Sequence, residues 1–262
     1  MSLAYEEYGD KTALLIVFLH GGGVSSWMWD NQIQFFQHYH CLTIDLPEQG
    51  KSKNTENFTI HSSAKEVNEL IKNKANGKKV IIVGFSLGAQ VVIQLVSIQP
   101  NFFDYAVINS ALVRPQVFYK KMIKPSIKLT FPFVKNKYFS KLQAKTLYIN
   151  DRFFETYFKE TSEMKRDTLI RILEENMSFK LPNDFQKVTT KILVTVGEKE
   201  KAIMKKSAMD IVSTNANCTG IIIPNTGHGI PLANPNFFNE MIENWIQEGI
   251  FPEDVILIEY NT

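Results

Sequence analysis

The chain has 262 residues, a length that fits one large domain or one domain carrying an insertion. Hydrophobic residues make up 44% and charged residues 21% of the chain, a balance that excludes wholesale disorder. The 29 Lys and Arg residues nearly balance the 27 Asp and Glu residues, and the resulting net charge of +2 is too small to predict nucleic-acid binding.

Targeting and cofactor signals are weak. Residues 1–10 are polar and acidic, unlike a secretory signal, and the longest apolar runs are far shorter than a membrane span. The two cysteines, Cys41 and Cys218, are too few for a disulfide framework and suit a reducing compartment, so a cytoplasmic location is expected. Cys and His do not recur at zinc-site spacings, and neither a metal nor an organic cofactor is expected.

Six short, almost continuously apolar runs predict parallel strands that are covered on both faces. Helical patterns lie between or after most of them and predict helices over residues 64–74, 87–98 and 237–245. This alternation predicts an α/β fold with a doubly wound, mostly parallel sheet. The predicted strands cover residues 13–19, 41–44, 79–83, 105–108, 191–196 and 220–223.

One long stretch interrupts this alternation. Residues 112–187 contain no clear strand pattern, and apolar residues such as Phe153, Tyr157, Leu169 and Leu173 recur at helical spacing. We therefore expect a helical insertion over residues 112–187, above a core formed by residues 1–111 and 188–262.

The most informative motif is Gly84-Phe85-Ser86-Leu87-Gly88, where a predicted strand ends and a helix begins. A G-x-S-x-G sequence in that context is typical of a sharp turn that exposes a nucleophilic serine. The helix that begins at Leu87 would direct backbone N–H groups and its positive end toward a developing oxyanion. The alternative is an ordinary turn serine between two glycines.

A serine nucleophile needs a base, and His228 is the best placed of the five histidines. It follows the last predicted strand, at the sheet edge where the other strands also end. The base needs a carboxylate that holds its tautomer. Two candidates, Glu198 and Glu200, follow the strand over residues 191–196, and Glu200 is favoured. The earlier strand ends at Asn109 and Ser110, which are not acidic.

A glycine loop, His20-Gly21-Gly22-Gly23, follows the first predicted strand. Glycines let a backbone approach a substrate closely, so this loop could supply an N–H group to an oxyanion hole together with Leu87. Gly22 is the favoured donor and Gly23 the alternative. The chain lacks the sequence patterns of phosphate-binding and dinucleotide-binding loops.

Together these segments resemble the α/β-hydrolase fold family over most of the chain except the insertion. The resemblance rests on the loop at 20–23, Asp45-Leu-Pro47, the turn at 84–88, the turn at 197–200 and Gly227-His228. It implies Ser86 as nucleophile, His228 as base, Glu200 as acid, and the N–H groups of Gly22 and Leu87 as oxyanion hole. It also implies that residues 112–187 form a cap over the substrate pocket.

Two departures from the family pattern are notable. The acid is Glu where Asp is more common, and Pro47-Glu-Gln-Gly50 replaces the usual Pro-Gly-His-Gly, which leaves the shape of this loop open. The family resemblance also implies that Asp45 is structural. The expected activity is hydrolysis of a small or acyl-chain ester, with thioester, amide or carbon–carbon bond hydrolysis and non-catalytic ligand binding as alternatives.

The charge distribution is uneven. Residues 112–150 contain nine Lys and Arg and no Asp or Glu, interleaved with seven Phe and Tyr residues. Such a stretch suits an anionic membrane surface or an anionic amphiphile. The alternative is a solvated lysine face over a core built from these aromatic residues.

Overall fold

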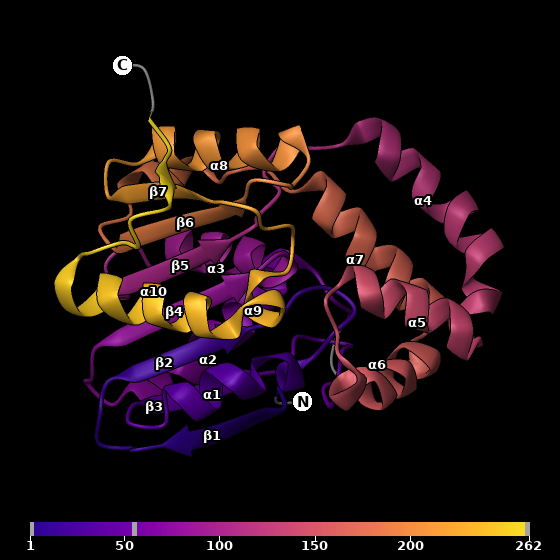
Figure 1. Ribbon diagram of the computed structural model, residues 1–262, viewed down its shortest axis with the longest axis horizontal. Helices are drawn as coiled ribbons and strands as arrows, with labels where there is room; N and C mark the ends of the chain where they lie inside the picture. Colours follow the sequence, from indigo (N-terminus) through magenta and orange to yellow (C-terminus); the bar gives the residue numbers. More distant parts are fainter. Residues whose placement is uncertain (1–2, 54–56, 260–262) are drawn as a thin grey trace.

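The computed structural model describes residues 3–53 and 57–259. Within these residues the chain forms one eight-stranded sheet with helices on both faces (Figure 1). The predicted fold class is confirmed. The strands lie in the order β1 (Tyr5–Gly9), β3 (His40–Ile44), β2 (Leu15–Leu19), β4 (Val80–Phe85), β5 (Tyr105–Asn109), β6 (Lys191–Gly197), β7 (Cys218–Ile223) and β8 (Ile256–Leu257).

The six inner strands are β3, β2, β4, β5, β6 and β7. They run parallel and are the six strands that the sequence predicts. Their continuous apolar runs have a simple cause, because both faces of the sheet are covered. In β2, Leu15, Val17 and Leu19 face one hydrophobic core, while Ile16 and Phe18 face the other. Since neighbouring side chains point to opposite faces, both sets must be apolar.

The helices divide between these two cores. On one face, α2 (Ile60–Ala75), α3 (Leu87–Ile98) and α8 (Ala202–Thr214) pack against the sheet. On the other face lie η1 (Ser26–Trp29), α1 (Asp30–Phe35) and α10 (Pro235–Glu248), with the short α9 (Ile230–Ala233) beside them.

The chain between β5 and β6 is helical, and its main helices gather beyond one end of the sheet (Figure 1). The long helices α4 and α7 of this segment pack against each other. The segment consists of α4 (Val117–Thr130), η2 (Phe131–Lys135), α5 (Lys137–Thr146), α6 (Asp151–Glu163), α7 (Arg166–Ser178) and η3 (Asn183–Lys187).

Candidate active site

Ser86 lies between β4 and α3 in a strained backbone conformation with a positive φ, at φ 52° and ψ −110°. The glycines on either side are required by close packing. A Cβ on Gly84 would lie 2.6 Å from the Gly88 carbonyl oxygen, and a Cβ on Gly88 would lie 2.3 Å from the Leu19 carbonyl oxygen. The Ser86 N–H also donates to the Asn109 carbonyl at 2.8 Å, which fixes the turn to the end of β5. A serine held at a strained turn of this kind is typical of a nucleophile.

His228 joins this serine to a carboxylate. Its Nε2 atom lies 3.0 Å from Ser86 Oγ, and its Nδ1 atom lies 2.7 Å from Glu200 Oε2. Because an ionised carboxylate only accepts hydrogen bonds, Nδ1 carries the proton and Nε2 is left to accept the serine proton. The ring of Phe85 packs beside the imidazole, with the ring centroids 5.2 Å apart. The three side chains thus form a continuous line of hydrogen bonds.

The Glu200 side chain is buried and its second oxygen is also bonded. Oε1 accepts from Ser110 Oγ at 2.6 Å and from the Gly197 N–H at 2.9 Å. Burial by itself would raise the pKa of Glu200, but the bonds from His228, Ser110 and Gly197 outweigh it and hold the pKa below its ordinary value. The carboxylate therefore stays ionised at neutral pH, opposite the imidazole.

Glu198, the alternative acid, has a different environment. It is exposed, and its Oε2 accepts from the Asn225 backbone N–H at 2.8 Å, in the loop that leads to His228. The structure therefore places Glu200, rather than Glu198, against the imidazole.

The glycine loop lies beside the start of α3. A Cβ added to Gly22 would lie 3.5 Å from Leu87 Cδ2, and the Gly22 backbone is exposed. Among the described residues, the backbone N–H groups of Gly22 and Leu87 have no protein acceptor. The Gly23 N–H instead donates to Gln49 Oε1 at 3.1 Å. Of the two candidate donors, Gly22, which the sequence favours, is therefore the one whose N–H group is free.

The loop at Pro47–Gly50, whose shape the sequence left open, connects the core to α7. Glu48 has φ 62°, and its carboxylate accepts two bonds from Arg171, each 2.9 Å long. It also accepts from Thr168 Oγ1 and the Phe58 N–H, both at 2.8 Å. Burial acts to raise the pKa of Glu48, but Arg171 and the other donors lower it overall. The departure from the family pattern thus supplies an ion pair to α7.

Other polar residues of the predicted motifs have local partners. His20 is buried, its Nε2 accepts from the Leu46 N–H at 2.9 Å, and its Nδ1 lies 2.7 Å from the Gly21 carbonyl. Burial lowers its pKa, so it remains neutral. Asp45 accepts from the N–H groups of Ser26 and Lys51, both at 2.8 Å. These bonds agree with a structural role for Asp45.

The helical segment reaches this site through two residues that the sequence analysis missed. A Cβ on Gly22 would lie 3.3 Å from Ile172 of α7. The Tyr148 side chain lies so close to Gly227 and Gly229 that a Cβ on either would fall within 2.7 Å of it. The Gly-His-Gly sequence around His228 is therefore the only local signal of this contact.

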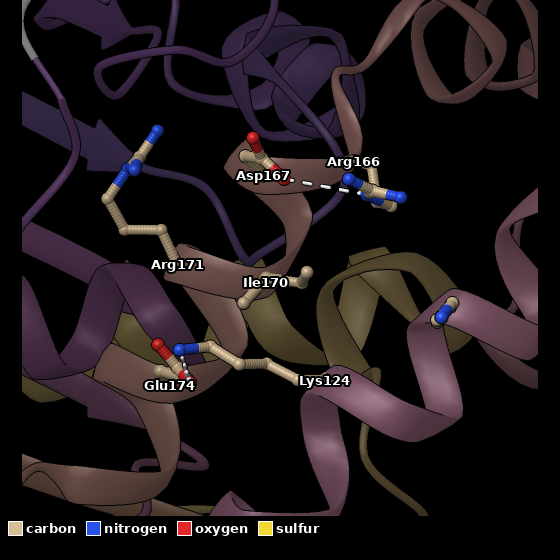
Figure 2. A pocket seen from close by; sticks show the side chains of 7 residues that line it. Lys124, Arg166, Asp167, Ile170, Arg171 and Glu174 are labelled. Carbon is tan, nitrogen blue, oxygen red and sulfur yellow. Dashed lines mark ion pairs between the residues drawn. The ribbon is translucent and has the colours of Figure 1, made fainter.

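A hollow of about 770 Å³ opens between α4 and α7 (Figure 2). Most of its charged side chains already have partners: Lys124 pairs with Glu174 and Arg166 with Asp167, each at 3.5 Å, while Arg171 binds Glu48. The hollow includes none of Ser86, Glu200 and His228, so we do not assign the chemistry to it. It is lined by Lys124, Lys128, Arg166, Asp167, Ile170, Arg171 and Glu174.

Neither a metal cluster nor a membrane span is found in the described part of the chain. Within residues 3–53 and 57–259, no group of three or more His, Cys, Asp or Glu could hold a metal ion. In the same residues, no helix combines the length and apolar character that crossing a bilayer requires.

Known proteins share both the sequence pattern and the fold. One relative, the pimeloyl-(acyl-carrier protein) methyl ester esterase of Wigglesworthia glossinidia brevipalpis, is 27% identical over 89% of this chain and 93% of its own. Another, a 2-hydroxy-6-oxo-6-(2'-aminophenyl)hexa-2,4-dienoic acid hydrolase of Metapseudomonas resinovorans, is 24% identical over 85% of this chain and 80% of its own. An esterase from Exiguobacterium antarcticum superimposes with a TM-score of 0.79 at 17% identity, covering 94% of this chain and 96% of its own.

The sequence profile described as the alpha/beta hydrolase family matches residues 16–241, which span β2 to α10 and include every residue of the candidate site. The chain belongs to the alpha/beta hydrolase family.

Proposed function

We propose that the protein is a serine hydrolase that cleaves a carboxylic ester through an acyl-enzyme. The observation that carries this proposal is the line of hydrogen bonds from Ser86 Oγ through His228 to Glu200, with lengths of 3.0 and 2.7 Å. Support for an ester comes from relatives named as esterases. The proposed substrate is a small-molecule or acyl-chain ester.

In the proposed reaction, Ser86 Oγ attacks the ester carbonyl carbon while His228 Nε2 takes the serine proton. The carbonyl oxygen becomes an oxyanion that accepts from the free N–H groups of Gly22 and Leu87. His228 then gives its proton to the departing alcohol, which leaves the acyl group on Ser86. A water molecule, deprotonated by His228, then attacks the acyl carbon, and His228 returns that proton to Ser86 Oγ as the acid is released. Glu200 stabilises the imidazolium and holds its orientation without taking the proton.

Residues 112–187 are proposed to act as a cap over this site. Two contacts support this role, Ile172 beside Gly22 and Tyr148 against Gly227 and Gly229. A cap that touches both the oxyanion loop and the histidine loop would shape the space on each side of Ser86. A cytoplasmic location is proposed as well, supported by two buried cysteines that form no disulfide.

The same residues could hydrolyse other bonds, and one observation favours a second candidate. The Metapseudomonas resinovorans relative is named as a hydrolase of a hexadienoic acid rather than of an ester. A panel of p-nitrophenyl esters of increasing chain length, run beside a dienoic acid of that class, distinguishes the two candidates by relative kcat/KM.

A fluorophosphonate probe tests the nucleophile. We expect stoichiometric labelling of the wild-type protein at Ser86, none of the Ser86→Ala variant, and a loss of esterase activity in that variant of about 10⁴–10⁶-fold. The variant should keep its fold, as circular dichroism would show. An unlabelled but folded wild-type protein would favour the non-catalytic alternative, and activity retained by Ser86→Ala would exclude Ser86 as the nucleophile.

A further inference from the structure

Helix α4 exposes a row of apolar side chains to solvent on the side away from α7. Phe118, Met122, Pro125 and Leu129 follow the spacing i, i+4, i+7 and i+11, so they lie along one face of the helix. Phe118 and Leu129 are 72% and 74% exposed. The opposite face carries Ile123, which is buried. The helix therefore has two apolar faces, only one of which is covered by the protein.

The next two elements expose further apolar side chains. Phe133 of η2 is exposed, and so are Tyr138 and Leu142, which are one turn apart on α5. Tyr138 is 76% exposed, so it does not belong to an aromatic core of the segment. We call these seven residues, Phe118, Met122, Pro125, Leu129, Phe133, Tyr138 and Leu142, the apolar ridge. Single exposed apolar residues are ordinary, but a ridge along three successive elements indicates an interaction surface.

On α4, Lys121 and Lys128 stand three residues after Phe118 and Pro125 and therefore border the ridge, whereas Lys120 lies on the opposite face. The ridge lies within residues 112–150, which hold nine Lys and Arg and no carboxylate. Some of these cations reach acids elsewhere, as Lys137 does with Glu155 and Lys141 with Asp151. Among the described residues, Lys120, Lys121, Lys128 and Lys145 have no carboxylate within ion-pair distance. Apolar side chains bordered by unpaired lysines match the interfacial region of an anionic bilayer.

We propose that the apolar ridge and its lysines dock the protein on an anionic membrane surface. The ridge residues would enter the boundary between headgroups and acyl chains, and the lysine stems would lie along it with their charges at the phosphates. This surface is separate from the chemistry of Ser86, so the proposal does not depend on the proposed function.

Charge complementarity selects this occupant over a second copy of the chain. Two copies joined at the ridge would bring lysines without an ion-pair partner, such as Lys121 and Lys128, against the same lysines of the other copy, which opposes association. The remaining residues of the chain carry a net charge of −7, because the whole chain is only +2. An anionic bilayer would therefore attract the ridge side of the molecule and repel the rest, which orients the protein with α4 and α5 toward the lipid.

Vesicle co-flotation tests the proposal. We expect the wild-type protein to float with vesicles of phosphatidylglycerol and phosphatidylcholine but not with phosphatidylcholine alone. Lys121→Gln with Lys128→Gln should weaken binding about 25-fold, because each basic residue near an anionic surface contributes about fivefold. Phe118→Ser with Leu129→Ser should also release the protein, at unchanged vesicle charge.

Matched variants on other surfaces serve as controls. Ile250→Ser and Met209→Ser remove exposed apolar side chains outside the segment, and Lys65→Gln with Lys206→Gln remove exposed charges there. These variants should bind vesicles like the wild type, and all variants should keep the wild-type melting temperature. The proposal is overturned if the wild type ignores anionic vesicles, binds neutral ones equally well, or responds to the control variants as strongly. Concentration-dependent dimers lost on Phe118→Ser with Leu129→Ser, or binding to an acidic protein without binding to vesicles, would overturn it as well.

Discussion

Glu198 and Glu200 lie in the same turn after β6, but their surroundings differ in whether the carboxylate can stabilise a charged imidazole. The Glu200 carboxylate is buried and holds three donors, one of which is the imidazole of His228. Glu198 is exposed and holds the Asn225 N–H. Only the first arrangement can stabilise an imidazolium, because a carboxylate in water and at a distance from the ring is screened.

We therefore expect Glu200→Gln to lose up to about 10⁴-fold in kcat, because an amide can no longer select the tautomer with its proton on Nδ1. Glu198→Gln serves as the matched control and should stay near the wild-type rate. Steady-state kinetics on one p-nitrophenyl ester compares the two variants. The assignment of the acid fails if the ranking is reversed or if both variants are fully active.

The sequence can predict a site residue when a short motif around that residue identifies it. Ser86 and His228 stand in short motifs at strand ends, and parallel topology brings such ends to one edge of a sheet. Their catalytic roles stay predictions. Gln49, Ser110 and Tyr148 carry no such signal, because each acts through a partner far along the chain. Gln49 binds Gly23, Ser110 binds Glu200, and Tyr148 lies against Gly227.

Helix α7 owes its position over the core to more than apolar packing. Its Arg171 and Thr168 converge on the single carboxylate of Glu48, in a bidentate arrangement that holds the helix against the loop after β3. Ile172 lies next in sequence to Arg171 and beside Gly22. The ion pair therefore also sets the distance between α7 and the glycine loop.

Arg171→Met should lower the free energy of unfolding by about 2 kcal/mol, because Glu48 would lose its charged partner while remaining largely buried. Arg166→Met on the same helix removes an exposed arginine that pairs with its neighbour Asp167, and should change stability by less than about 0.5 kcal/mol. Urea unfolding of both variants measures the difference. Equal losses would mean that the Glu48 contact contributes no more than a surface ion pair.

Helix α6 is joined to the core by Glu160, which accepts from Trp27 Nε1 at 2.9 Å and Ser25 Oγ at 2.8 Å. Burial raises the pKa of Glu160 above its ordinary value, although these two bonds oppose the shift, and the nearby Asp45 charge adds to it. The folded protein thus binds this proton more tightly than the unfolded chain does. Stability from this group falls as pH rises from the unfolded pKa through the folded one.

Glu160→Gln removes this titration. At about pH 7 the variant should gain stability relative to the wild type, because the wild type must bury an ionised carboxylate there. At about pH 4 this gain should be smaller, because the wild-type carboxyl is protonated and its penalty is gone. Urea unfolding of both proteins at the two pH values gives the difference, in which the other titrating groups cancel. A difference that does not change with pH would refute the effect.

The strands show how far patterns predict elements. The six inner strands are apolar on both faces and therefore legible in sequence. The edge strand β1 reads Tyr-Glu-Glu-Tyr-Gly and pairs only with β3, and β8 is two exposed residues beside β7. An edge strand with solvent on one side needs no apolar run, so neither was predicted.

For the whole molecule, the concentration of positive charge in residues 112–150 predicts different responses of charged and neutral substrates. Activity on an anionic ester should fall with added salt, because salt screens attraction beyond about 8 Å at physiological ionic strength. A matched neutral ester should be insensitive. Charge reversal at Lys120, Lys121 and Lys124 should mimic the effect of salt in initial-rate measurements. Equal responses of the two esters would show that the basic segment does not steer substrates.

The hydrogen bond between Ser86 and His228 joins residues 142 positions apart. During synthesis the serine turn leaves the ribosome long before its proposed base, since β5, β6, β7 and the six helices α3 to α8 lie between them. In the proposed mechanism, the serine of a growing chain therefore has no base and cannot attack an ester before His228 is made. In that mechanism the site would become competent only when β7 docks beside β6, so the first catalytic turnover would report that the last parallel strand has joined the sheet.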